Sequence, residues 1–273
     1  MRPKETSETQ KLGFRSSNEL VSIASSFSKE IRGFEYCGSI RGKDGIVSHA
    51  VTFSPLEIKQ LTFFKERGFS GFINGRPTVI LFEGRDEAMN EEGVLNTVCY
   101  LQENLERNLR IKDTEKILKE AVITKADREF DNHAVSIGLL YDYAFENGDI
   151  VWFWNYAISG EGGVFILSNL TKEGEHSLRL ARGKKTNDDR EPFIGIEMSR
   201  KNDLFVLGSS GLIRGYDDFG SKITEIISGE FAKWGFVHDC LFGGPIESIR
   251  LRMEAVARRS RVNISMGMIG RRD

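Results

Sequence analysis

Two long apolar-rich runs around a short polar turn constrain the fold of this chain more than any other feature. The runs are AVSIGLLYDYAF and IVWFWNYAI, separated by Glu146-Asn147-Gly148-Asp149. Asn-Gly between two such runs is a strong hairpin signal, because both residues tolerate the positive φ of a tight turn. Trp152 and Trp154 alternate along the second run, so they share one face, which we expect to be core.

Further strands are predicted on both sides of this hairpin. Each is a short apolar or alternating run bounded by turn residues. They are FEYCGSI, IVSHAVTF, RPTVILF, VFILS, SLRLA, DLFVLG and NISMGMI. The turn between the first two contains Gly42-Lys43-Asp44-Gly45.

Helices are predicted from apolar residues at three- and four-residue spacing. The first has the face Val94, Leu95, Val98, Leu101, Leu105 and Leu109. In the second, Asp113 is the expected cap, and the stripe is Ile117, Leu118, Ala121 and Val122. Two more are expected at about Lys222 to Ser228 and about Pro245 to Arg259. The order of elements predicts an α+β fold in which a β-sandwich is flanked by helices.

Length and composition favour one large domain. Residues 1–28 are rich in Ser, Thr, Lys and Glu, and we expect a flexible tail before a domain at 29–273. The net charge of −2 and pI of about 6.2 give no basic footprint for nucleic acid or an anionic membrane. No window approaches the ~18 apolar residues of a membrane span. The three cysteines are widely spaced and read as reduced thiols, so we expect a cytoplasmic or nuclear protein.

Five strings, in collinear order, resemble the type 2C protein phosphatases (PP2C, or PPM), the metal-dependent serine/threonine phosphatases. They are YLQENLERNL, ILKEAVITKADREF, IVWFWNYAIS, DLFVLGSSGL and ARRSRVNIS. The likeness covers roughly residues 33 to 270 and is closest to the plant members. It implies a four-layer α-β-β-α sandwich of two antiparallel sheets, with a two-metal site at one edge.

The family's chemistry needs carboxylates, because Mg²⁺ or Mn²⁺ takes oxygen ligands and activates a bridging water. The resemblance places the family's metal-binding positions on His49, Ala50, Glu83, Gly84, Ile158, Ser210 and Val262. Of its acidic positions only Glu83 keeps a carboxylate. Lys43 falls where the family has a basic residue that grips the substrate phosphate.

The resemblance therefore implies a pseudophosphatase with a degenerate metal site. Loss of one second-shell partner typically costs about 10–100-fold in metal affinity or activity, and here several direct ligands are replaced. We expect no catalytic residue, no cofactor, and a protein-binding or scaffold role toward a kinase or phosphoprotein. The alternatives are a weakly active Mg- or Mn-dependent phosphatase that uses Glu83, Gly84 and further ligands not recognised in the sequence, and a folded relic without a role.

Simpler interpretations accompany these candidates. We expect Glu83 to be a solvated carboxylate at a strand end, paired with Arg85, and Lys43 to be a surface lysine. The acidic pairs Asp188-Asp189 and Asp217-Asp218 are expected in solvated loops. The basic cluster near the C-terminus is expected to be a solvated face, or else a docking site for an acidic or phosphorylated partner. It comprises Arg258, Arg259, Arg261, Arg271 and Arg272.

Overall fold

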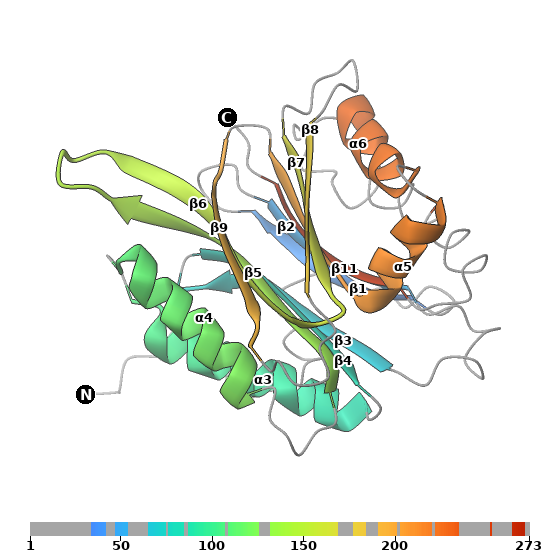
Figure 1. Ribbon diagram of the computed structural model, residues 1–273, viewed down its shortest axis with the longest axis horizontal. Coiled ribbons are helices and arrows are strands. Elements are labelled where there is room, and N and C mark those ends of the chain that lie inside the picture. Colours follow the sequence, from blue (N-terminus) through green and yellow to red (C-terminus); the bar gives the residue numbers. More distant parts are fainter. Residues whose placement is uncertain are drawn as a thin grey trace, which may run out of the picture.

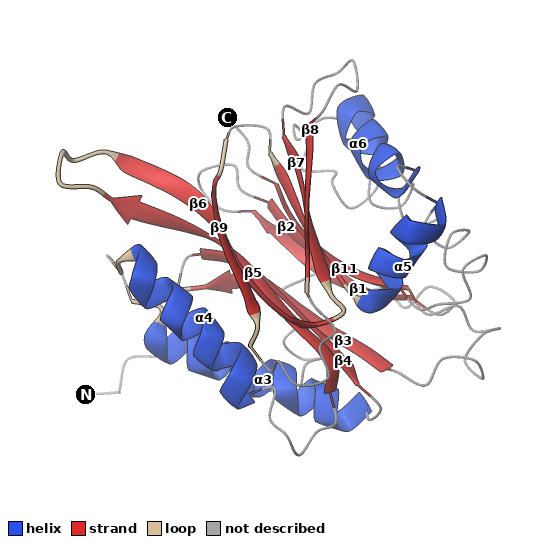
Figure 2. Cartoon of the chain, viewed as in Figure 1, coloured by secondary structure: helices blue, strands red, loops and turns tan. Residues whose placement is uncertain are grey.

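A computed structural model shows two antiparallel sheets packed face to face, with helices on both outer sides (Figure 2). The predicted four-layer α+β sandwich is confirmed. The structure describes residues 34–41, 47–53, 65–74, 76–84, 87–106, 109–125, 132–168, 177–183, 191–200, 203–219, 222–234, 252 and 264–270. The predicted tail at 1–28 and the body of the predicted helix at 245–259 lie outside these residues.

Sheet A has six strands in the spatial order β1-β2-β11-β10-β7-β8, all antiparallel. The strands are β1 (Phe34–Arg41), β2 (Val47–Phe53), β7 (Gly163–Ser168), β8 (Ser177–Arg182), β10 (Leu204–Gly208) and β11 (Ile264–Gly270). Each corresponds to a predicted run. β11, the last strand of the chain, lies between β2 and β10, so the sheet is complete only when the two ends of the domain meet.

Sheet B has five strands in the order β3-β4-β5-β6-β9. They are β3 (Lys65–Ile73), β4 (Arg76–Gly84), β5 (Asn132–Ala144), β6 (Ile150–Gly160) and β9 (Phe193–Met198). The hairpin of β5 and β6 around Asn147-Gly148 is confirmed, and Gly148 has a φ of 85°. We did not predict β3 or β9. Both are edge strands of the sheet. Their sequences contain glycine and charged residues, which are depleted in strands and obscure the apolar pattern.

The helices divide between the outer faces of the two sheets (Figure 1). α3 (Glu87–Asn104) and α4 (Ile111–Lys125) pack on sheet B, and α5 (Ser210–Phe219) packs on β10, β11 and β7 of sheet A. α6 (Lys222–Trp234) follows α5 and confirms the helix predicted at 222–228. α5 was not predicted. None of the helices in the described ranges has the length and apolar character needed to cross a membrane.

The boundary between α3 and α4 differs from the prediction, which continued the first helix to Leu109. Asn74 donates through Nδ2 to the carbonyls of Gln102 (2.6 Å) and Leu105 (3.0 Å), so a side chain from the β3–β4 turn satisfies the helix end. α4 then begins at Ile111, and Asp113 is not its cap. The Asp113 carboxylate instead accepts a bond from the Arg110 backbone N–H (3.3 Å), as the third residue of a capping box does.

Two cores fill the layers. One lies between sheet B and its helices, and the other between the two sheets. In the inter-sheet core Trp154 is fully buried and stacks on Phe205, with ring centroids 5.4 Å apart. Trp152 packs against the same core, which confirms the prediction that the two tryptophans share a buried face.

Candidate functional site

The candidate site lies where β4 ends and α5 begins. Val79 and Leu81 on β4 face the inter-sheet core, and alternate residues of a strand share a face. The side chain of Glu83 therefore turns toward the space between the sheets, at the sheet's edge. It is only 6% exposed, so the prediction of a solvated carboxylate was wrong. Arg85, its expected partner, lies outside the described residues.

Glu83 bonds to Ser210 through both of its carboxylate oxygens. The Ser210 hydroxyl donates to Oε1 (2.5 Å), and the Ser210 backbone N–H donates to Oε2 (3.1 Å). Ser210 is the first residue of α5 and is also 6% exposed. The first N–H groups of a helix have no partner within it, and the helix dipole favours a negative charge there. Glu83 therefore caps α5 from the opposite sheet.

Gly84 follows Glu83 and is also engaged within the chain. Its carbonyl oxygen accepts a bond from Nδ2 of Asn90, a fully buried residue of α3 (3.5 Å). The Gly84 carbonyl, at a position where the family binds metal, is thus bonded to α3, which packs on sheet B. Both groups that the sequence left as possible ligands, the Glu83 carboxylate and the Gly84 carbonyl, have hydrogen-bond donors of the protein itself.

Ile158 lies two rows deeper in sheet B than Glu83. Along the sheet Leu81 pairs with Ser136 and Ser136 with Ile158, so these three positions form one row. Ile158 is 1% exposed and belongs to the inter-sheet core. The residue of β6 in the row of Glu83 is Gly160, which has no side chain to bind a metal.

The remaining family-equivalent positions are only partly described. Ala50 pairs with Gly267, which pairs with Leu207, so the backbone of Ala50 lies in a row near the end of β10. His49 pairs with Met268. Val262 and Lys43 lie outside the described residues, as do Asp188-Asp189 and the whole C-terminal arginine cluster.

Asp217 and Asp218 lie in α5, so the loop prediction for this pair was wrong. Asp217 is exposed and pairs with Arg182 of β8 (2.7 Å). This ion pair joins the outer helix to the edge of sheet A. Within the described ranges, His, Cys, Asp and Glu side chains nowhere gather in a group of three or more that could hold a metal.

A second polar contact between the sheets was missed by sequence reasoning. Arg179 on β8 pairs with Glu197 on β9, and the Tyr156 hydroxyl donates to Glu197 Oε1 (3.0 Å). Burial, together with the neighbouring Glu197 carboxylate, raises the pKa of the Tyr156 phenol well above its usual range. No local pattern identifies this cluster, because its members become neighbours only when the edge strands of both sheets meet.

Comparison with known proteins identifies the fold. No protein-family model matches the chain, and no curated protein matches it in sequence. Among solved structures, RsbX in complex with magnesium has a TM-score of 0.51 and 10% identity, over 85% of this chain and 98% of that one. The PP2C phosphatase domain of SpoIIE from Bacillus subtilis has a TM-score of 0.45 and 11% identity, over 93% and 86% of the two chains.

The catalytic domain of the serine/threonine phosphatase PstP, in complex with two manganese ions, is also similar. It has a TM-score of 0.43 and 12% identity, over 77% of this chain and 98% of that one. The structural neighbours are thus PP2C-family phosphatases. RsbX was solved with magnesium and PstP with manganese. At such identities the likeness shows the fold alone.

Proposed function

We propose that this PP2C-fold protein does not hydrolyse phosphoproteins and acts as a protein-binding module. The observation that carries the proposal is the pair of hydrogen bonds from Ser210 to Glu83. In this fold a metal-binding carboxylate at the end of β4 has to be available to an ion. Here both of its oxygens are engaged by α5.

The residues at the family-equivalent positions do not fit a two-metal centre. Mg²⁺ sheds its water reluctantly and needs several oxygen ligands arranged around it. Glu83 would have to give up its bonds to Ser210, and the Ser210 hydroxyl would bring no charge in exchange. Ile158 is apolar and buried in the core. Since even a lost second-shell partner costs about 10–100-fold, these replacements together argue against binding at physiological metal levels.

The packing of the sandwich supports a retained binding role. Apolar side chains fill both cores, so a rigid framework exists without a metal. By its resemblance to phosphatases, the chain's partners are proposed to be kinases or phosphorylated proteins. A binder needs only a shaped surface held by such a framework.

Calorimetric titration of Mn²⁺ and Mg²⁺ into the whole protein, with phosphopeptide hydrolysis assayed in parallel, tests the loss of chemistry. We expect neither millimolar binding nor turnover. Metal-dependent turnover that disappears in Glu83→Ala would show a weakly active phosphatase and overturn the proposal. Ser177→Ala, at an exposed position of β8, serves as the control variant.

The binding role needs its own test, in which phosphorylated and unphosphorylated versions of the same peptides from kinase activation loops are titrated into the protein. Saturable binding without hydrolysis is the expected result. A protein that binds neither form, while remaining folded and monomeric, would contradict the proposed class of partner.

A further inference from the structure

The hairpin of β5 and β6 extends beyond the rest of sheet B. Pairing of β4 with β5 ends at Leu139, and pairing of β9 with β6 ends at Phe153. The backbone N–H of Ser199, just after β9, donates to the carbonyl of Trp152. Within the described part of the chain, residues 140–151, here called the overhanging hairpin, have strand partners only in β5 and β6 themselves. Figure 1 shows the hairpin projecting past the helices and the other strands.

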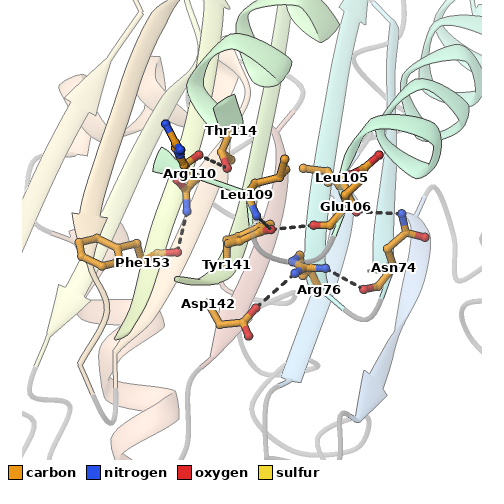
Figure 3. A network of polar contacts seen from close by, with 11 residues as sticks. Asn74, Arg76, Leu105, Glu106, Leu109, Arg110, Thr114, Tyr141, Asp142 and Phe153 are labelled. Carbon is orange, nitrogen blue, oxygen red and sulfur yellow. Dashed lines mark hydrogen bonds and ion pairs between the residues drawn. The ribbon is translucent and has the colours of Figure 1, made fainter. Parts of the chain in front are cut away.

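A polar network fixes the base of the overhanging hairpin to the connection between α3 and α4 (Figure 3). The Tyr141 hydroxyl donates to the carbonyl of Glu106 (2.7 Å) and accepts from the backbone N–H of Leu109 (3.0 Å). Arg76 lies over the Tyr141 ring, 4.0 Å from its centroid, and pairs with Asp142 (3.5 Å). Because Tyr141 and Arg76 are buried, these contacts hold the hairpin and the connection in one arrangement.

An open groove lies between the two parts that this network joins. It has a volume of about 740 Å³, and its lining includes Arg110 from the connection and Phe145 and Val151 from the hairpin. Phe145 is 43% exposed, so its ring offers apolar surface to a ligand in the groove. The walls are preorganised, which lowers the entropy cost of binding.

The charges around the groove indicate what it can bind. Glu146 and Asp149 lie on the hairpin wall, and both are exposed. Arg110, which also lines the groove, adds a positive charge on the other wall. The carboxylates suit Lys or Arg, the apolar surface suits a large apolar side chain, and Arg110 can donate to backbone carbonyls of an extended chain.

We propose that this groove binds an extended peptide segment of a partner protein in which a large apolar side chain stands next to Lys or Arg. The groove is at the Arg76 end of β4, and Glu83 is at the other end, roughly 20 Å along the strand. Peptide binding here therefore does not depend on whether the Glu83 site has lost phosphatase chemistry.

Selection from a random peptide library against the whole protein tests this proposal. The enriched peptides should combine an apolar residue with an adjacent Lys or Arg. Calorimetry should show about tenfold weaker binding to the Glu146→Lys, Asp149→Lys double variant, since two attractive charges become repulsive. Phe145→Ser should also weaken binding. Glu92→Lys, a charge reversal at an exposed position of α3, should leave the affinity unchanged.

Three results would overturn the proposal. One is a library selection that yields no binder or an acidic consensus. Another is binding that both groove variants leave unchanged. The third is concentration-dependent dimerisation in sedimentation velocity that the groove variants abolish, because a second copy of the chain would then be the occupant.

Discussion

Glu83 at the end of β4 and Ser210 at the start of α5 are joined by two hydrogen bonds across the sandwich, although 127 residues separate them in the sequence. Glu83 belongs to sheet B, and Ser210 lies two residues after the end of β10 in sheet A. A carboxylate that could have bound a cation instead binds the positive end of a helix, so the contact supplies its own compensation for burying the charge.

Removing the Ser210 hydroxyl should destabilise the fold. Ser210→Ala leaves the buried Oε1 of Glu83 without its donor, and such a loss costs about 1–3 kcal/mol. Glu83→Gln should cost less, because the amide oxygen can accept from the Ser210 N–H while the hydroxyl rotates to accept from the amide nitrogen. Chemical denaturation measures both, with Ser177→Ala as the exposed control. Equal stability of Ser210→Ala and the native chain would mean that the contact contributes nothing.

Ser210→Asp should create a weak metal site that the native chain lacks. Two carboxylates at hydrogen-bonding distance repel each other, so the variant should melt at a lower temperature than the native chain. Mn²⁺ should then raise the Tm of the variant and leave that of the native chain unchanged, because a ligand stabilises the state it binds. Ser177→Asp controls for the added charge. A similar Mn²⁺ effect on the native chain would contradict the proposed loss of the metal site.

Close approach of the sheets should make Gly138 intolerant of a side chain. A Cβ at Gly138 would lie 2.3 Å from Cε1 of Phe205, whose ring is held against Trp154. Overpacking of this kind typically costs about 1–3 kcal/mol. Gly229 offers a matched comparison in α6, where a Cβ would meet nothing within 4 Å.

Gly229→Ala should therefore stabilise the protein by about 0.5–1 kcal/mol through its higher helix propensity. Thermal unfolding of both variants checks this: the Tm should fall in Gly138→Ala and rise in Gly229→Ala. Stabilisation by Gly138→Ala would show that the sheets are farther apart than described.

Alkaline pH should weaken the fold through buried tyrosines. Burial raises the pKa of Tyr143 from its ordinary value of 10.0 to about 12, and it also raises the pKa values of Tyr100 and Tyr156. Between pH 10 and 12 the unfolded state therefore binds fewer protons than the folded state, so the free energy of unfolding falls as the pH rises.

Phenolate absorbance and circular dichroism measured together across this range check the prediction. These phenols should ionise only as the fold is lost. Tyr143→Phe should remove part of the pH dependence. Full ionisation of all tyrosines near pH 10 with the circular dichroism unchanged would rule out the burial described.

The sequence alone determined most of the β framework. The Asn147-Gly148 turn, the alternation of Trp152 with Trp154 and the apolar run of β4 are local patterns, and each predicted the element observed. Helix boundaries were less predictable. α3 ends where Asn74, from another element, satisfies its carbonyls, and no pattern within the helix encodes that contact.

The candidate site shows the same division. The sequence predicted that the metal-binding carboxylates are replaced at most positions and that Glu83 is the one retained. Only the tertiary structure decided what Glu83 does, because its environment depends on a serine from the other sheet. Local sequence patterns predict which face of a helix or strand is buried, because the spacing of apolar residues along the chain determines that face. The partner of a buried charge is set by how the sheets pack, and it emerges only when segments 127 residues apart meet.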